Sequence, residues 1–523
     1  MSRWLASGAF RAKVVETYGL CMQALWLLLL LFVPITSFPP LVDRLGGSPV
    51  SPLAILPLGL LLILWLAPKI VRGVRLPSLQ GPLLLFVFLA LVSSSMALAL
   101  PLGPYKGQTI LARETRALAT LALGLGFFAC AMLFPRNDRE LARSLRWLYL
   151  GAILMLAWST VQGWFVFDGQ PGMPLKLNAI HRWFSIRDLV GDRVTGLAYE
   201  PSWFADQLVV LYLPLWAGSV LGNYSVFPRI ARRVSVELLL AFWGLVMFAM
   251  TRSRVSFISL AIILSIVILG MAWVGSGGLS RRFPLGGLNA SVAGRLLVRL
   301  AVEGVVLVAI IGILIGAAWA FSRVDRRLSQ LFTLPERLEG VHVLYPGEEV
   351  FHVADRLAFA ERVVYWAAGY RVFERYPLMG VGLGNSGFLF EQTLPGYAYS
   401  LTEIQALLEP GDLHFPNPKN LWVRLLAETG AFGFAAFGVW LILMASAASV
   451  LSGRRQGLQR VIGLAGLLGL ASILVEGFSL DSFALPQMWI LLGIVNNAIC
   501  REGDAAPTRA GAGNEFSPQP LTP

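Results

Sequence analysis

The sequence predicts an all-α integral membrane protein with about twelve transmembrane helices and one large, partly helical loop between the ninth and tenth. Hydrophobic residues make up 56% of the chain and charged residues only 14%, a balance outside the range of soluble globular proteins. Apolar segments of roughly the 20 residues that cross a bilayer recur along the chain. The hydrophilic stretch 322–424 interrupts them late in the sequence.

The apolar segments define the expected domain organisation. We expect a membrane domain of nine helices at 1–321, the large loop at 322–424, three more membrane helices at 425–500 and a disordered tail at 501–523. The first segment follows a basic stretch, as in a signal peptide, but it has no small-residue cleavage site and is expected to be retained. The expected spans are 19–38, 51–67, 81–100, 117–134, 148–167, 201–220, 234–250, 255–274, 300–321, 430–451, 461–475 and 483–499.

Lys and Arg fall in every second connection between these segments. Because positively charged short loops stay in the cytoplasm, both termini are expected there, with the large loop in the periplasm and the chain in a bacterial inner membrane. The same loops account for much of the net charge of +12, so a nucleic-acid partner is not expected. The basic connections carry Lys69, Arg72 and Arg75; Arg136, Arg139, Arg143 and Arg146; Arg229, Arg232 and Arg233; Arg281, Arg282, Arg295 and Arg299; and Arg454, Arg455 and Arg460.

Two carboxylates stand at the start of the sixth span. Glu200 precedes Pro201, so it is either a functional group or an acid that caps the helix and complements its dipole. Asp206 lies further inside the expected membrane span. A charged side chain there is unfavourable unless it contacts water or an opposite charge, so we expect Asp206 to line a cavity. Ser202 is four residues before it, on the same helix face.

The turn between the seventh and eighth spans reads Arg252-Ser253-Arg254. Two guanidinium groups beside a hydroxyl suit phosphate oxygens at a membrane surface. The alternative is that these arginines only anchor the helices at the interface.

The large loop is expected to contain an amphipathic helix over 352–376, which would hold Arg356 and Arg362 over the membrane surface. Residues 380–387 match the spacing G-x-G-x-x-G. A dinucleotide site is not expected, because the match follows a helix and lacks the βαβ context. We expect a glycine turn that packs the loop closely onto the membrane domain.

Further candidates precede the tenth span. His414 beside Asp412 is either a general base or a hydrogen-bonded loop residue. Glu428 is either functional or a cap of the helix expected from residue 430. Because the chain has no close pair of His or Cys and no Asp-x-Asp pair, we expect no metal and no other cofactor.

The order of these motifs resembles the O-antigen ligase and polymerase superfamily of bacterial envelope glycosyltransferases. The resemblance covers more than half of the chain, although each motif is short. Its parts are Arg193 with Thr195-Gly196 before Glu200-Pro201-Ser202, Thr251 with Ser253-Arg254, the arginine helix ending in Trp366, the stretch 377–382, and Asn420 followed by 427–430 and Gly433.

The resemblance implies a donor glycan linked to undecaprenyl diphosphate and a glycan acceptor, handled at the outer face of the inner membrane. Arg254 and Arg362, with Arg193 or Arg356, would hold the diphosphate, since delocalised cations offset the charge of the leaving group. One base would activate the acceptor hydroxyl. Glu200, Asp206, Asp412 and His414 remain open for that role.

One departure favours a polymerase of O-antigen or exopolysaccharide over a ligase. Ligases of the family carry a His-Asn pair where this chain has Lys419-Asn420, and lysine suits phosphate binding better than proton abstraction. A chain-length regulator and a flippase are possible partners. A lipid-linked glycan transporter is the competing class, but the sequence shows no two-half repeat and its intramembrane charges lie towards span ends.

Overall fold

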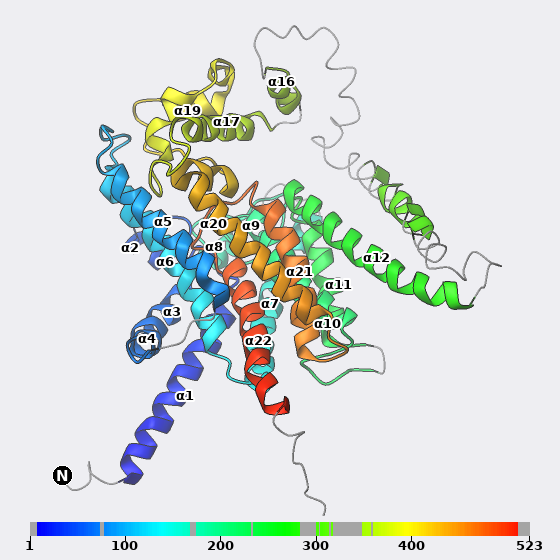
Figure 1. The fold of residues 1–523 in the computed structure, drawn as a ribbon. Coiled ribbons are helices and arrows are strands. Elements are labelled where there is room, and N and C mark those ends of the chain that lie inside the picture. Colours follow the sequence, from blue (N-terminus) through cyan, green and yellow to red (C-terminus); the bar gives the residue numbers. More distant parts are fainter. Residues whose placement is uncertain are drawn as a thin grey trace, which may run out of the picture.

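The computed structural model is a helical protein (Figure 1). Within the described residues every regular element is a helix, and the only extended pairings are isolated bridges such as that between Ser37 and Ser51. The structure describes residues 8–510 except 46, 74–77, 168–173, 232–233, 283–299, 303, 313–314, 317–318, 320–347 and 357–358.

The helices follow the apolar segments along the chain. They are α1 (Gly8–Phe32), α2 (Pro39–Arg44), α3 (Ile55–Leu61), η1 (Leu62–Leu66), α4 (Ala67–Val71), η2 (Ser78–Gln80), α5 (Gly81–Ala97), α6 (Ile110–Leu133), α7 (Asp138–Phe167), α8 (Leu175–His181), α9 (Pro201–Gln207), η3 (Leu208–Tyr212), α10 (Leu213–Leu221), α11 (Val236–Ala249), α12 (Arg254–Arg282), α16 (Glu348–Arg356), α17 (Ala360–Arg375), η5 (Ser386–Leu389), α18 (Phe390–Thr393), η6 (Gly396–Ser400), α19 (Thr402–Leu408), α20 (Leu421–Ser452), α21 (Leu458–Glu476) and α22 (Pro486–Ala510).

Among the described residues, seven helical stretches are long and apolar enough to cross a membrane, which confirms the all-α membrane class. Four shorter apolar helices also fall on expected spans, at Ile55–Val71, Gly81–Ala97, Val236–Ala249 and Leu300–Gly312. The last expected span, 483–499, falls on α22. The count of about twelve crossings stays a prediction. The seven stretches are Lys13–Phe32, Ile110–Leu133, Asp138–Phe167, Pro201–Leu221, Arg254–Ala272, Leu421–Ser452 and Leu458–Glu476.

The packing has an inner group of helices surrounded by helices with apolar outer faces. α20 packs on α5 and α21, α21 also packs on α10 and α12, and α22 packs on α6. Large apolar side chains point away from this group, among them Phe88 at 60% exposure and Phe242 at 70%. An outer face of this kind suits contact with lipid tails, where exposed apolar area carries no penalty.

The stretch from α9 to α10 is one bent membrane helix. The wide turn η3 (Leu208–Tyr212) lies within it, just before Pro214. Proline cannot donate a backbone hydrogen bond and crowds the preceding turn, and a π-type turn accommodates this break in the hydrogen-bond ladder. Asp206 lies one turn before Val210 of η3, and both residues are buried.

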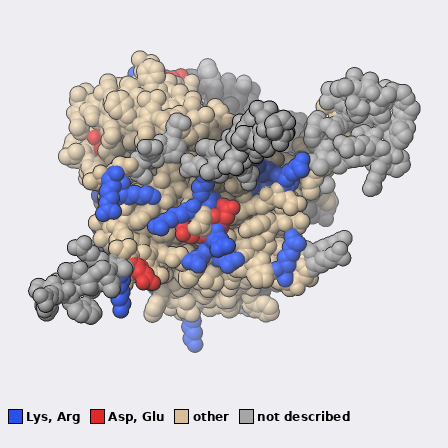
Figure 2. All heavy atoms as spheres, turned by 60° about the horizontal axis from the view of Figure 1, so that its bottom comes forward, with Lys and Arg blue, Asp and Glu red and all other residues tan. Residues whose placement is uncertain are grey.

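The large loop and the chain ends lie at opposite ends of the bundle. Figure 1 shows α17 and α19 at the top, with the start of α1 and the end of α22 at the bottom. Lys and Arg side chains are spread over the bottom face, with few acids among them (Figure 2). This is the arrangement expected if the basic loops face the cytoplasm.

The prediction of one continuous helix over 352–376 is wrong. The structure has two helices, α16 and α17, and Phe359 between them has a non-helical φ of −131°. The break brings Phe351 of α16 against Tyr397, at 4.5 Å between ring centroids, within the same apolar cluster as Val364 of α17. Burial of both faces in one cluster therefore outweighs the continuous helical pattern.

α20 is interrupted at Gly430, whose φ of 64° and ψ of −171° are not helical, so the segment expected from residue 430 starts at this break. A shorter helical stretch precedes it from Leu421, where Asn420 accepts backbone N–H groups from Trp422 and Val423, as a good N-cap residue does. Glu428 lies at the end of this stretch, and its carboxylate accepts from Ser386 and Arg424 and caps no backbone N–H group. At the other end, α22 continues to Ala510, beyond the expected end of the membrane domain at 500, and residues 511–523 lie outside the described part.

Candidate functional site

A glycine turn docks the large loop onto the membrane helices, as expected from the sequence. Gly380 and Gly430 have φ of +69° and +64°, a region that side chains with a Cβ rarely adopt. A Cβ on Gly430 would overlap the Leu378 carbonyl oxygen. The backbone N–H of Gly382 donates to the Glu428 carbonyl oxygen at 3.0 Å. The large loop is thereby held against the first two turns of α20.

A buried ion pair stands beside this contact. Arg424 Nε donates to Glu428 Oε2 at 2.9 Å, and the two side chains are only 11% and 1% exposed. Ser386 from the large loop donates to the other Glu428 oxygen at 2.9 Å. Arg424 Nη1 donates to the Asp481 carbonyl oxygen at 2.6 Å. Arg424 thus joins α20 to the loop between α21 and α22, which we call the α21–α22 loop (residues 477–485).

A second arginine holds the same loop from the other side. Arg362 Nη1, on α17, donates to the carbonyl oxygens of Ser479 at 3.0 Å and Lys419 at 3.2 Å. Arg362 Nε and Nη2 donate no hydrogen bond to any other described residue, although guanidinium offers five N–H donors in all. Arg362 and Arg424 therefore meet at this loop, and only Arg362 was among the predicted site residues.

The Lys419 side chain contacts the carboxylate of Glu403 and the aromatic ring of Tyr365. Its Nζ lies 2.7 Å from Glu403 Oε1 and 4.0 Å from the Tyr365 ring centroid. Burial opposes ionisation of Glu403, but the hydrogen bond and charge of Lys419 more than offset it and lower the pKa of Glu403. The Lys419 side chain is therefore held by Glu403 and Tyr365, and its backbone carbonyl oxygen accepts from Arg362.

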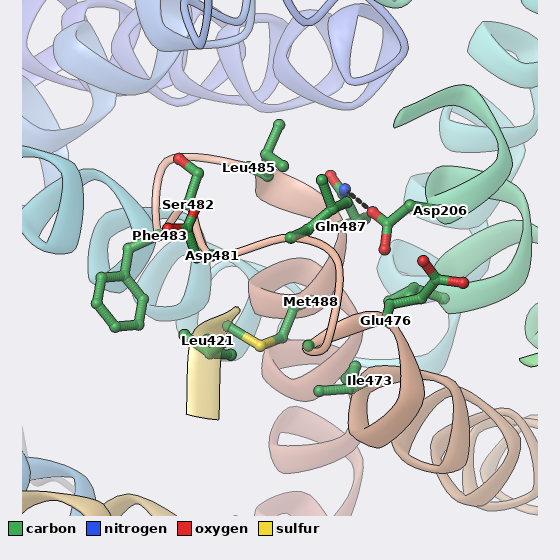
Figure 3. A pocket seen from close by; sticks show the side chains of 13 residues that line it. Asp206, Leu421, Ile473, Glu476, Asp481, Ser482, Phe483, Leu485, Gln487 and Met488 are labelled. Atoms are coloured by element: carbon green, nitrogen blue, oxygen red, sulfur yellow. Dashed lines mark hydrogen bonds between the residues drawn. The ribbon is translucent and has the colours of Figure 1, made fainter. Parts of the chain in front are cut away.

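A cavity lies beneath the α21–α22 loop and between membrane helices (Figure 3). Asp206 of α9, Glu476 of α21 and Gln487 of α22 line it, and each is less than 5% exposed. Gln487 Nε2 donates a hydrogen bond to Asp206 Oδ2. Ser259 of α12 donates to Glu476 Oε1 at 2.7 Å. The expectation that Asp206 lines a cavity is confirmed.

Asp481 also lines this cavity, in the loop that the two arginines hold. Burial raises the pKa of its carboxyl, and the Arg424 guanidinium opposes that rise. Its Oδ2 is buried and has no hydrogen-bond partner among the described atoms. Three carboxyl groups thus line the cavity, and the loop that carries one of them accepts hydrogen bonds from Arg362 and Arg424.

The predicted arginine turn does not line the cavity, but it leads into α12, whose Ser259 contacts Glu476. Asp192 brings two arginines together, with Arg193 Nε at 3.6 Å and Arg252 Nη1 at 3.9 Å from its carboxylate. Arg254 begins α12, five residues before Ser259. At a rise of about 1.5 Å per residue, Arg254 is roughly 8 Å along the helix axis from the side chain that contacts Glu476.

Two predicted bases are placed elsewhere. His414 is 91% exposed, and its Nδ1 lies 2.5 Å from Asp412 Oδ1. Glu200 pairs with Arg187 at 2.7 Å and accepts from Ser202 at 2.6 Å, and its side chain makes no cap hydrogen bond. Neither residue lines the cavity. Arg356 ends α16, but its side chain lies outside the described part of the structure.

Sequence reasoning missed Asp481 and Gln487. A signal was present, because the stretch 478–487 places two polar groups, Asp481-Ser482 and Gln487, between two strongly apolar segments. An ionisable residue placed within a membrane domain is a candidate functional residue, because its charge is costly there. Over the described residues, no three His, Cys, Asp or Glu side chains form a group suited to a metal ion.

Part of the site lies within a match to a known family, whereas Asp206, Glu476, Asp481 and Gln487 lie outside the matched range. The family model described as O-antigen ligase matches residues 239–438. That range contains the predicted phosphate-binding residues Arg254 and Arg362, and also Arg424 with its partner Glu428. Comparison with curated proteins found no match. The family match supports the resemblance of the chain to the O-antigen ligase/polymerase superfamily that the motifs indicate.

Proposed function

We propose that the protein is a polysaccharide polymerase of the periplasmic face of the bacterial inner membrane. It transfers a glycan from undecaprenyl diphosphate to a sugar hydroxyl of the acceptor and builds O-antigen or exopolysaccharide. The family match supports glycan transfer. The identity of the donor and the choice of polymerase belong to the proposal.

The observation that carries the proposal is the convergence of Arg362 and Arg424 on the α21–α22 loop, above the cavity that contains Asp206. A departing diphosphate needs cations at the point where its charge develops, and guanidinium groups match its oxygens with paired N–H donors. We assign diphosphate binding to Arg254 and Arg362, with support from Arg193 and Lys419. Arg356 is assigned the same role from the resemblance.

The acceptor hydroxyl must lose a proton as it attacks the anomeric carbon. Among the predicted bases, Asp206 is the one that lines the cavity, whereas His414 is largely exposed and Glu200 is paired with Arg187. We therefore place the reacting sugars at this cavity. The leaving diphosphate needs little protonation, so the proposed reaction uses the charges of the chain itself and no metal.

A ligase is the second candidate, because the matching family model carries that description. The local geometry favours the polymerase. Lys419 occupies the position where ligases carry histidine, and its Nζ is paired with Glu403 Oε1 at 2.7 Å. His414 lies five residues earlier and does not replace that histidine, because it is exposed and paired with Asp412.

The test is the glycan profile of a deletion strain complemented with wild type, Arg254→Ala, Arg362→Ala or Arg182→Ala. Arg182 is the matched control, because it is a surface arginine at 65% exposure that pairs with Asp188. Membrane expression is measured for every variant. Short, single-repeat glycans on their final carrier in both site variants would support a polymerase.

Two other outcomes would count against this assignment. Full-length polymer stranded on undecaprenyl diphosphate would identify a ligase instead. A wild-type profile in both Arg254→Ala and Arg362→Ala would reject the glycan-transfer site placed here.

A further inference from the structure

Two carboxyl groups from distant parts of the chain share the cavity. Asp206 on α9 is 4% exposed and Glu476 at the end of α21 is 3% exposed. Figure 3 shows the two side chains next to each other at one side of the cavity, with Gln487 joined to Asp206. Both are set among membrane-spanning helices, where an uncompensated charge is most costly.

The partners of these carboxyls are neutral. Asp206 receives a hydrogen bond from the Gln487 amide, and Glu476 receives one from the Ser259 hydroxyl. None of the ion pairs formed between described residues includes Asp206 or Glu476. Two carboxylates in one buried space repel each other, and a single retained proton removes that repulsion.

Hydrogen bonding indicates which carboxyl keeps the proton. An amide N–H can only donate, so Gln487 favours the ionised form of Asp206. A serine hydroxyl can donate or accept. Ser259 Oγ also lies 3.4 Å from the Val255 carbonyl oxygen, to which it can donate while it accepts the proton of Glu476. The Ser256 hydroxyl also bonds Glu476, and both serines can accommodate either form of this carboxyl, whereas the Gln487 N–H suits only ionised Asp206, so the shared proton is assigned to Glu476.

One polar atom in the cavity has no partner. Gln487 is 2% exposed, and its Oε1 is buried without a hydrogen-bond partner among the described residues. A buried carbonyl oxygen of this kind usually finds a donor. A sugar offers several neighbouring hydroxyl groups, so one can donate to Gln487 while another approaches Asp206.

We infer that Asp206 and Glu476 form a carboxyl pair that holds one proton and serves as the base for the acceptor sugar. This inference rests on the proposed glycan transfer. The acceptor oxygen forms a bond to the anomeric carbon as the bond to the diphosphate oxygen breaks, and the diphosphate leaves with the electron pair. The hydroxyl proton passes to Asp206, and the pair later releases one proton to water.

Other charged or titratable groups surround the pair. Asp481 faces the same cavity from the α21–α22 loop. Arg254 starts α12, which packs against α9, and Tyr212 lies in η3 on the same bent helix as Asp206. α11, which also contacts η3, carries Glu237, hydrogen-bonded to the Val226 backbone at 2.8 Å. Asp481 is the further carboxyl that shares the cavity with the pair.

The first experiment detects the proton directly and needs no substrate. Infrared spectra of the purified full-length protein in lipid vesicles at neutral pH should contain the carbonyl band of a protonated carboxylic acid. We expect Glu476→Gln to remove intensity from that band. Glu237→Gln is the control for loss of a buried glutamate. An unchanged band in Glu476→Gln would overturn the pair.

The second experiment measures polymer formation against pH in membranes from the complemented deletion strain, with the native lipid-linked donor. Asp206→Asn should lower the rate by on the order of 100-fold or more, as loss of a general base does. Glu476→Gln should also lower the rate, because the two side chains then cannot share a proton, whereas Arg182→Ala, at a surface arginine that is 65% exposed, should leave the rate unchanged. A wild-type rate in Asp206→Asn would overturn the role as base.

The pH profile distinguishes this pair from two unrelated structural residues. At high pH the wild type loses the shared proton, so two like charges face each other and activity should fall. The activity of Glu476→Gln should not decrease at high pH in this way. A decrease like that of the wild type would overturn the inference. If the infrared band behaves as expected but both arginine variants leave the glycan profile unchanged, the proposed function fails while the proton-sharing pair stands.

Discussion

Arg424 and Glu428 form a buried ion pair one helical turn apart in α20, with Nε and Oε2 separated by 2.9 Å. The same guanidinium donates to the carbonyl oxygen of Asp481, and the same carboxylate accepts from Ser386. The pair therefore joins three separate segments: the large loop, α20 and the α21–α22 loop. Its integrity should determine whether the loop covers the cavity.

Removing one member of this pair should cost more than removing both. Arg424→Met or Glu428→Met alone leaves an uncompensated buried charge, and such changes cost about 3–5 kcal/mol. The double variant removes both charges and should be less destabilised than the sum of the singles. Equilibrium unfolding in mixed detergent micelles measures all three. Strictly additive losses would show that the two side chains act independently.

Gly430→Ala should detach the large loop from the membrane domain. The positive φ of Gly430 and the overlap of a Cβ with the Leu378 carbonyl oxygen both oppose alanine, and backbone strain alone costs about 1–3 kcal/mol. Limited proteolysis should cut the large loop faster in this variant. Gly438→Ala in the same helix is the control, because a Cβ there meets no atom within 4 Å. Equal cleavage rates in the two variants would contradict the docking role.

Local sequence patterns predicted the helices and the glycine turn. A membrane span requires a continuous run of apolar residues, and a positive φ favours glycine, so both can be recognised from neighbouring residues. The Asp206–Gln487 contact joins residues 281 positions apart, and no local pattern encodes it. The break at Phe359 was missed for a related reason. Its cause is the packing of Phe351 on Tyr397, which overrides a helical pattern that continues on both sides.

Asn420 should contribute to the start of α20 through its side-chain oxygen. Asn420 Oδ1 accepts the N–H groups of Trp422 at 2.9 Å and Val423 at 3.1 Å. Loss of such a cap in Asn420→Ala should cost about 1 kcal/mol. Asn420→Ser keeps an acceptor and should lose less. Thermal unfolding of the two variants measures the difference, and an equal loss would mean that Asn420 stabilises the protein by packing alone.

His181 should make the protein less stable in acid. The side chain is buried, and that burial lowers the pKa of His181 from 6.5 to about 4. A lowered pKa means that the unfolded chain binds the proton first, so stability is complete above about pH 6.5 and is lost as the pH falls towards 4. The loss attributable to this one group is about 3 kcal/mol at most, since one pKa unit corresponds to about 1.4 kcal/mol.

The variant His181→Gln removes the titrating group and keeps a polar side chain that can face Trp158, whose Nε1 donates to His181 Nδ1 at 3.3 Å. Its melting temperature should therefore change less than that of the wild type between pH 6.5 and 4. His414→Gln is the matched control, because His414 is 91% exposed and its removal should leave the acid sensitivity in place. The same acid-induced fall in wild type and His181→Gln would show that another group, not His181, takes up the proton on unfolding.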